Sequence, residues 1–98
     1  MFIKIHKSCR TLVALADADL IGKKFDEGKR QMDVRENFYK GSKVNEEEAI
    51  NMLKIQAMED ATFNIVGKKS IDAAIKAGII TRKGIATIKG IPFALVLL

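Results

Sequence analysis

The stretch that decides the fold is residues 63–80, Phe-Asn-Ile-Val-Gly-Lys-Lys-Ser-Ile-Asp-Ala-Ala-Ile-Lys-Ala-Gly-Ile-Ile. Its first four residues have the short apolar pattern of a buried strand. The apolar residues after Gly67 recur at helical spacing, and we expect this helix to end at Gly78, because a glycine followed by an apolar residue such as Ile79 is typical of helix ends. The stretch therefore predicts a strand, a glycine turn and a helix.

The turn between this strand and helix, Gly67-Lys68-Lys69-Ser70, is a candidate anion site. Backbone N–H groups at a helix start, with two lysines beside them, often hold phosphate. The turn is not a nucleotide-binding P-loop, because Thr62 stands where the first glycine is required and Lys69 where Ser or Thr is required. A structural helix start, with Ser70 as cap and Asp72 beside the helix dipole, is the favoured interpretation, and a bound phosphate ligand is the alternative.

The composition indicates one globular domain, residues 1–98, because 48% of the residues are hydrophobic and 30% are charged. No apolar run reaches the roughly 18 residues that a membrane-spanning helix needs. The first seven residues alternate lysine with apolar side chains, unlike a signal peptide. We therefore expect a cytoplasmic protein without a membrane partner.

Candidate catalytic groups are few. Cys9 is the only cysteine and His6 the only histidine, which excludes an internal disulfide and any metal site or triad that needs two of either. A Cys9 nucleophile assisted by His6 is the minor alternative to a small residue at a strand end. Asp33 and Glu36 stay open as an acid pair. We expect a protein that is not an enzyme, with no catalytic residue, no metal ligand and no cofactor.

The net charge of +5 comes from the last two fifths of the chain. Residues 61–98 hold six basic residues and one acidic residue, and the other 11 basic and 11 acidic residues cancel. A basic patch attracts polyanions, but no aromatic residue except Phe93 interleaves closely with it, so we expect contact with the RNA backbone instead of base reading. The sequence predicts a translation-associated RNA or ribonucleoprotein contact through Gly67, Lys68, Lys69, Ser70, Arg82, Lys83 and Lys89.

The patterns along the chain predict an α+β fold. We expect a two-layer domain, a mixed β-sheet with about three helices mainly on one face, starting with an N-terminal β-hairpin. The expected strands are 2–7, 11–16, 30–35, 62–66 and 85–89, with helical turns at 18–24, loops at 25–29, 40–43 and 81–84, and a turn or edge at 90–93. Asn45 with Glu48 forms a capping box for a further helix, which explains Glu46-Glu47-Glu48 better than a metal site does.

The tail from Phe93 to Leu98 is wholly apolar. An exposed edge of this kind promotes aggregation, so we expect the tail to be buried in the sheet or against a partner chain. Burial within the fold is favoured. A homodimerisation or protein-interaction surface is the alternative.

Several short motifs together resemble a family of small archaeal proteins of unknown function: Ala16-Asp17, Leu20-Ile21-Gly22-Lys23-Lys24-Phe25, Phe38-Tyr39-Lys40-Gly41, Glu46-Glu47-Glu48-Ala49, Asn64-Ile65-Val66-Gly67, Ala74-Ile75-Lys76-Ala77-Gly78 and Gly90-Ile91-Pro92. The resemblance implies a single α+β domain, an archaeal cytoplasmic setting and no established activity. Its members tend to lie near translation genes, which favours the RNA hypothesis. They often continue with His-Ala-Gln where this chain has Phe93-Ala94-Leu95, which places any function of that histidine in doubt.

Overall fold

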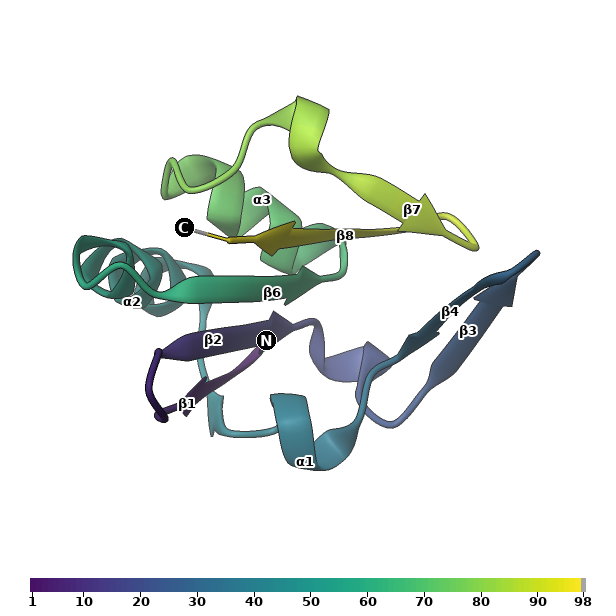
Figure 1. Cartoon of the computed structure of the whole chain (residues 1–98), viewed down its shortest axis with the longest axis horizontal. Helices are drawn as coiled ribbons and strands as arrows, with labels where there is room; N and C mark the ends of the chain where they lie inside the picture. Colours follow the sequence, from purple (N-terminus) through teal and green to yellow (C-terminus); the bar gives the residue numbers. More distant parts are fainter. Residues whose placement is uncertain (98) are drawn as a thin grey trace.

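A six-stranded mixed sheet forms the centre of the structure, a computed structural model that describes residues 1–97 (Figure 1). β2 and β6 run parallel, and each of the other neighbouring pairs is antiparallel. The first two strands form the predicted N-terminal hairpin. In spatial order the strands are β5 (Ser42–Lys43), β1 (Phe2–His6), β2 (Leu12–Ala16), β6 (Thr62–Val66), β8 (Ile91–Val96) and β7 (Ala86–Ile88).

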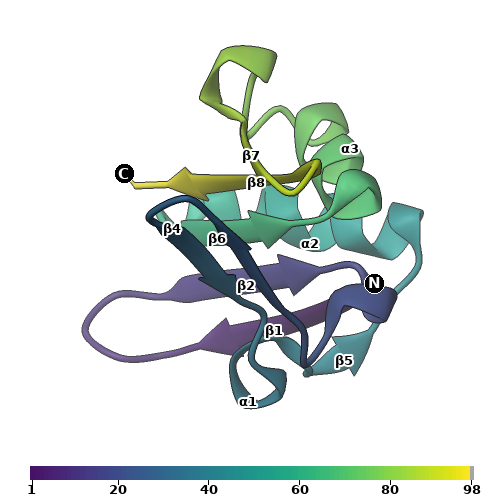
Figure 2. The same ribbon diagram turned by 90° about the vertical axis from the view of Figure 1, so that its right-hand side faces the viewer.

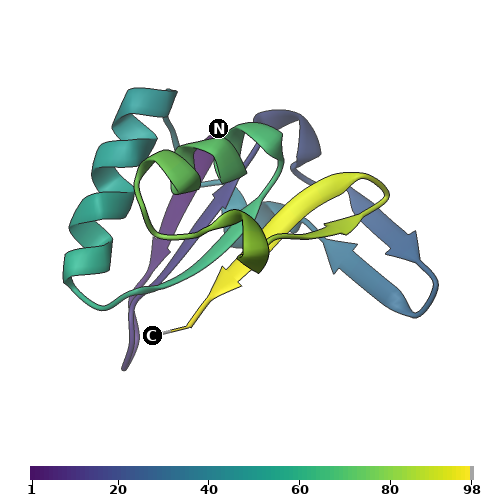
Figure 3. The same ribbon diagram turned by 90° about the horizontal axis from the view of Figure 1, so that it is seen from above.

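Two helices cover one face of this sheet, α2 (Glu46–Met58) and α3 (Lys68–Lys76) (Figure 3). Alternate residues of the central strands point toward them, because successive side chains of a strand lie on opposite faces. Phe63 is fully buried there, together with Leu53 of α2. This face holds the larger apolar core.

The opposite face carries shorter elements, which are η1 (Ala18–Leu20), the hairpin of β3 (Lys24–Glu27) and β4 (Arg30–Asp33), and α1 (Glu36–Tyr39). Figure 2 shows the hairpin crossing in front of the sheet. A second cluster of buried residues lies on this face and includes Leu20, Val34, Tyr39 and Val66. Burial raises the pKa of Tyr39 to about 12, so its phenol is neutral at pH 7. The fold is therefore the predicted α+β domain.

Both predicted helix boundaries of the larger core are confirmed. The Asn45 side chain accepts from the Glu48 N–H at 2.8 Å, and the Glu48 carboxylate accepts from the Asn45 N–H at 3.0 Å, which completes the capping box. After α3, Gly78 adopts a φ of +78°. The Ile79 N–H then reaches the carbonyl of Ala74 at 3.2 Å, as in a glycine-terminated helix.

Three predicted loops or turns are wrong in part. The predicted loop at 40–43 contains β5, which pairs with β1. Residues 24–27 form β3, and Gly28 at a φ of +62° makes the tight turn into β4. The predicted turn at 90–93 holds the start of β8, because the chain reverses earlier, at Lys89 and Gly90, which both have positive φ. The helical turns predicted for 18–24 shorten to η1, and Gly22 at a φ of +83° follows it.

The apolar tail forms most of β8, which lies between β6 and β7. Ala94 is buried, whereas Leu95 is 63% exposed and Leu97 is 80% exposed. Leu98, the last residue of the predicted tail, lies outside the described residues. Within residues 1–97, no helix is long and apolar enough to cross a membrane.

Candidate functional site

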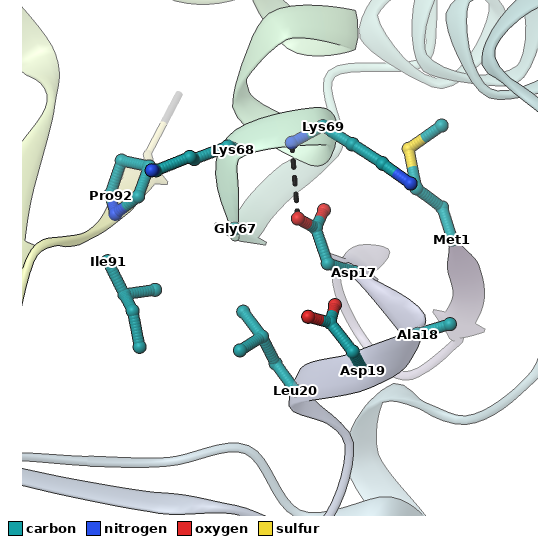
Figure 4. A pocket seen from close by; sticks show the side chains of 10 residues that line it. All are labelled: Met1, Asp17, Ala18, Asp19, Leu20, Gly67, Lys68, Lys69, Ile91 and Pro92. Atoms are coloured by element: carbon teal, nitrogen blue, oxygen red, sulfur yellow. Dashed lines mark hydrogen bonds between the residues drawn. The ribbon is translucent and has the colours of Figure 1, made fainter.

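A cleft with a volume of about 630 Å³ opens at the carboxyl ends of the parallel strands β2 and β6 (Figure 4). After β2 the chain turns into η1, on one face of the sheet, and after β6 it turns into α3, on the other. This divergence leaves a crevice between neighbouring parallel strands. Open α/β sheets bind ligands at such points.

The carboxylate of Asp17, the residue that follows β2, lies against the first turn of α3. It accepts hydrogen bonds from the Lys69 N–H at 3.1 Å, the Ser70 N–H at 2.8 Å and the Ser70 hydroxyl at 2.7 Å. Asp17 is only 7% exposed. The expectation that Ser70 caps α3 is therefore wrong, because a carboxylate distant in sequence supplies the cap.

Gly67 makes this contact sterically feasible. Its φ of +106° lies in a region that side chains rarely adopt, and an added Cβ would lie 2.3 Å from Cγ of Asp17. The Gly67 N–H donates to the carbonyl of Pro92 at 2.8 Å, which ties the turn to β8. Because Gly67 has no side chain, the ends of β2 and β6 can approach each other closely.

The two lysines of the predicted anion site stand at the mouth of the cleft. Figure 4 shows Lys68 extending toward Pro92 and Lys69 extending toward Met1. Both are exposed, and neither forms an ion pair within residues 1–97. The helix N–H groups of the phosphate hypothesis are already bonded to Asp17. What the site offers an anion is therefore a pair of ammonium groups.

The other predicted basic residues are exposed but do not line the cleft. Arg82 and Lys83 belong to η2 (Arg82–Gly84), and Lys89 lies in the turn between β7 and β8. Figure 1 places α3, η2 and this turn in the same half of the molecule. Lys76 differs, because its ammonium contacts Glu46 at 3.0 Å and Asp72 at 3.1 Å, and these hydrogen bonds raise its pKa.

Sequence reasoning missed Asp19, which lines the cleft with Leu20 and Ile91. The Asp19 carboxylate points into the cleft in Figure 4, and no hydrogen bond or ion pair within residues 1–97 engages it. The available signal was Asp17-Ala18-Asp19 directly after a buried strand, since loops at strand ends commonly carry binding residues.

The minor catalytic candidates are engaged elsewhere. Nε2 of His6 lies 2.8 Å from the carbonyl of Phe38, and the two rings are stacked. Cys9 is exposed in the loop after β1. Asp33 pairs with Arg35 at 3.2 Å, and Glu36 pairs with Lys40 at 3.6 Å. None of these groups lines the cleft.

Comparisons with known proteins bear on the family and the fold. No curated protein matches the sequence. The fold is similar to the crystal structure of an uncharacterized conserved protein from Methanopyrus kandleri, with a TM-score of 0.87 and 22% identity over 97% of this chain and 88% of that chain. At this identity the likeness shows the fold alone. Residues 6–98 match the family described as protein of unknown function (DUF424). The predicted resemblance to a family of unknown function is thereby confirmed, and the chain belongs to the DUF424 family.

Proposed function

We propose that this protein binds RNA or a ribonucleoprotein through its basic C-terminal surface and that it does so without catalysing a reaction. The observation that carries the proposal is the pair Lys68 and Lys69, exposed and without ion pairs within residues 1–97, at the mouth of the cleft. Phosphate oxygens are the ligands that such ammonium groups attract.

The charge balance supports a polyanion as the partner. Lys76 is neutralised by two carboxylates, whereas no ion pair within residues 1–97 engages the five other basic residues of the C-terminal part. Arg82, Lys83 and Lys89 extend the positive surface beyond the cleft. None of the residues that line the cleft is aromatic, so backbone contacts supply the affinity. The basic surface comprises Lys68, Lys69, Arg82, Lys83 and Lys89.

Binding of single-stranded RNA is expected to weaken steeply with salt. Five phosphate contacts give a slope of about −3.5 in the logarithmic salt plot, which is about a 100-fold loss of affinity between 50 and 200 mM salt. The Lys68→Glu/Lys69→Glu variant should reduce the slope by about 1.4 and weaken binding at least about tenfold at 50 mM salt. Fluorescence anisotropy with a labelled oligonucleotide measures both quantities.

The matched control is Lys43→Glu/Lys54→Glu, which makes the same change in net charge on exposed residues that do not line the cleft. It should lower affinity far less than the cleft variant. Equal losses in the two variants would show that only overall charge matters, and binding that is absent or independent of salt would reject the proposal.

A second candidate is self-association through β8, which Leu95 and Leu97 favour because they expose 63% and 80% of their surface. Contiguous patches of exposed apolar side chains commonly mark an interface. We expect a dimer at micromolar concentration and a monomeric Leu95→Ser/Leu97→Ser variant with an unchanged far-UV spectrum. Sedimentation velocity measures the state, and a wild-type monomer at all concentrations would exclude this candidate.

A further inference from the structure

We propose that the cleft between the ends of β2 and β6 takes one ribonucleotide unit and that Asp19 accepts a hydrogen bond from the ribose 2′-hydroxyl. The inference rests on the proposed RNA binding and adds which part of the polymer the cleft recognises. The site is the set Asp19, Leu20, Lys68, Lys69, Ile91 and Pro92.

The dimensions of the cleft suit one nucleotide. Its volume of about 630 Å³ lies within the range of about 300–1,000 Å³ that small-ligand sites occupy. It is neither an enclosed cavity nor a flat surface. A nucleotide within a longer strand therefore has room to enter while the strand continues on both sides.

The walls divide into chemically distinct parts. Leu20, Ile91 and Pro92 form an apolar side that suits the face of a base or the carbons of a sugar (Figure 4). Lys68 and Lys69 diverge from the start of α3, Lys68 toward Pro92 and Lys69 toward Met1, where they suit the two phosphates that flank one nucleotide. This amphipathic division matches a nucleotide better than it matches a free phosphate.

Asp19 identifies the sugar as the recognised group. A carboxylate near two lysines weakens a site that binds phosphate alone, because it repels the anion. Unlike Asp17, whose oxygens are bonded to α3, Asp19 has no hydrogen bond or ion pair within residues 1–97 and points into the cleft. A carboxylate oxygen accepts from hydroxyl donors, and the 2′-hydroxyl is the donor that RNA has and DNA lacks.

The test compares single-stranded RNA and DNA of the same sequence by fluorescence anisotropy. The wild type should prefer RNA by about tenfold, the effect expected for a hydrogen bond to a charged group. Asp19→Ala should abolish the preference, with RNA affinity falling and DNA affinity unchanged or higher. Asp26→Ala, which removes an exposed carboxylate on β3, should leave the preference unchanged.

The direction of the change decides the inference. If Asp19 only repels phosphates, its removal raises RNA and DNA affinity equally, and the inference is overturned. Equal wild-type affinity for the two polymers also overturns it, although a steep salt dependence would then still support the proposed polyanion binding. Absence of binding to either polymer rejects both proposals.

A second variant tests the cleft without changing charge. Ala18 lines the cleft and is exposed, so Ala18→Leu adds apolar volume to it. The variant should lose the preference for RNA, and a nucleoside 5′-monophosphate should no longer compete with RNA for binding to it. Inorganic phosphate should compete poorly with RNA for both the wild type and the variant. Undiminished competition by the nucleotide would place the ribonucleotide outside this cleft.

Discussion

Replacement of Asp17 by alanine is expected to lower the free energy of unfolding by about 3 kcal/mol. The substitution removes the acceptor of three hydrogen bonds at the start of α3. Two of the donors belong to Ser70, which is fully buried and has no access to water. A buried donor left without a partner costs about 1–3 kcal/mol, so the loss exceeds that of an ordinary cap.

Urea unfolding followed by circular dichroism measures this effect, which corresponds to a decrease in Tm of about 15 °C for a domain of this size. Asp19→Ala is the control, since Asp19 is exposed and makes no hydrogen bond within residues 1–97. Its effect should stay within about 0.5 kcal/mol. The double variant Asp17→Ala/Ser70→Ala should lose less free energy of unfolding than the sum of the losses in the two single variants. The reason is that Ser70→Ala removes the hydroxyl donor that Asp17→Ala leaves without a partner. A loss below about 1 kcal/mol for Asp17→Ala would contradict the assignment of this carboxylate as the α3 cap.

Substitution of Gly67 by alanine is expected to destabilise the protein by about 4 kcal/mol, which leaves little of the stability of a small domain. Two causes act together. The φ of +106° with a ψ of +156° is a conformation almost restricted to glycine. The added Cβ also meets Cγ of Asp17 at 2.3 Å and would displace the carboxylate from α3.

Gly78 is the reference glycine without a clash. It also has a positive φ, +78°, but an added Cβ meets nothing within 4 Å, so Gly78→Ala should cost only about 1 kcal/mol. The difference between the two variants comprises the contact with Asp17 and the greater backbone strain at Gly67. In the Asp17→Ala background the clash is absent, so the decrease in the further cost of Gly67→Ala measures the contact with Asp17. Equal effects at the two glycines would refute the steric account.

Features that depend on neighbours in sequence could be predicted well. The capping box of Asn45 and Glu48 spans three residues, and Gly78 ends α3 through bonds to the preceding turn. The apolar run at 62–66 predicted the buried strand β6, and the structure confirms it. The strand β4 was predicted, but its hairpin partner β3 was missed because charged residues occupy most of β3, and its apolar contacts come from a cluster of residues distant in sequence, including residues of β2 and β6.

The candidate site could be predicted only in part. Lys68 and Lys69 were identified from the turn that contains them, and the structure places them at the cleft. The role of Asp17 could not be identified in this way, because 53 residues separate it from Ser70. Its side chain makes no capping hydrogen bond to η1, the turn that follows it directly in the sequence.

The sequence by itself determined the class of fold, the start of α2, the end of α3 and the excess of positive charge in residues 61–98, because periodicity, capping and charge are properties of neighbouring residues. Only the tertiary structure decided what the turn at Gly67 does. The parallel pairing of β2 with β6 brings Asp17 against the start of α3 and leaves Asp19 facing the cleft. Because two strands distant in sequence pair, the turn that resembled a phosphate loop is the start of a helix that Asp17 caps. Beside it lies a cleft with Lys68 and Lys69 at its mouth.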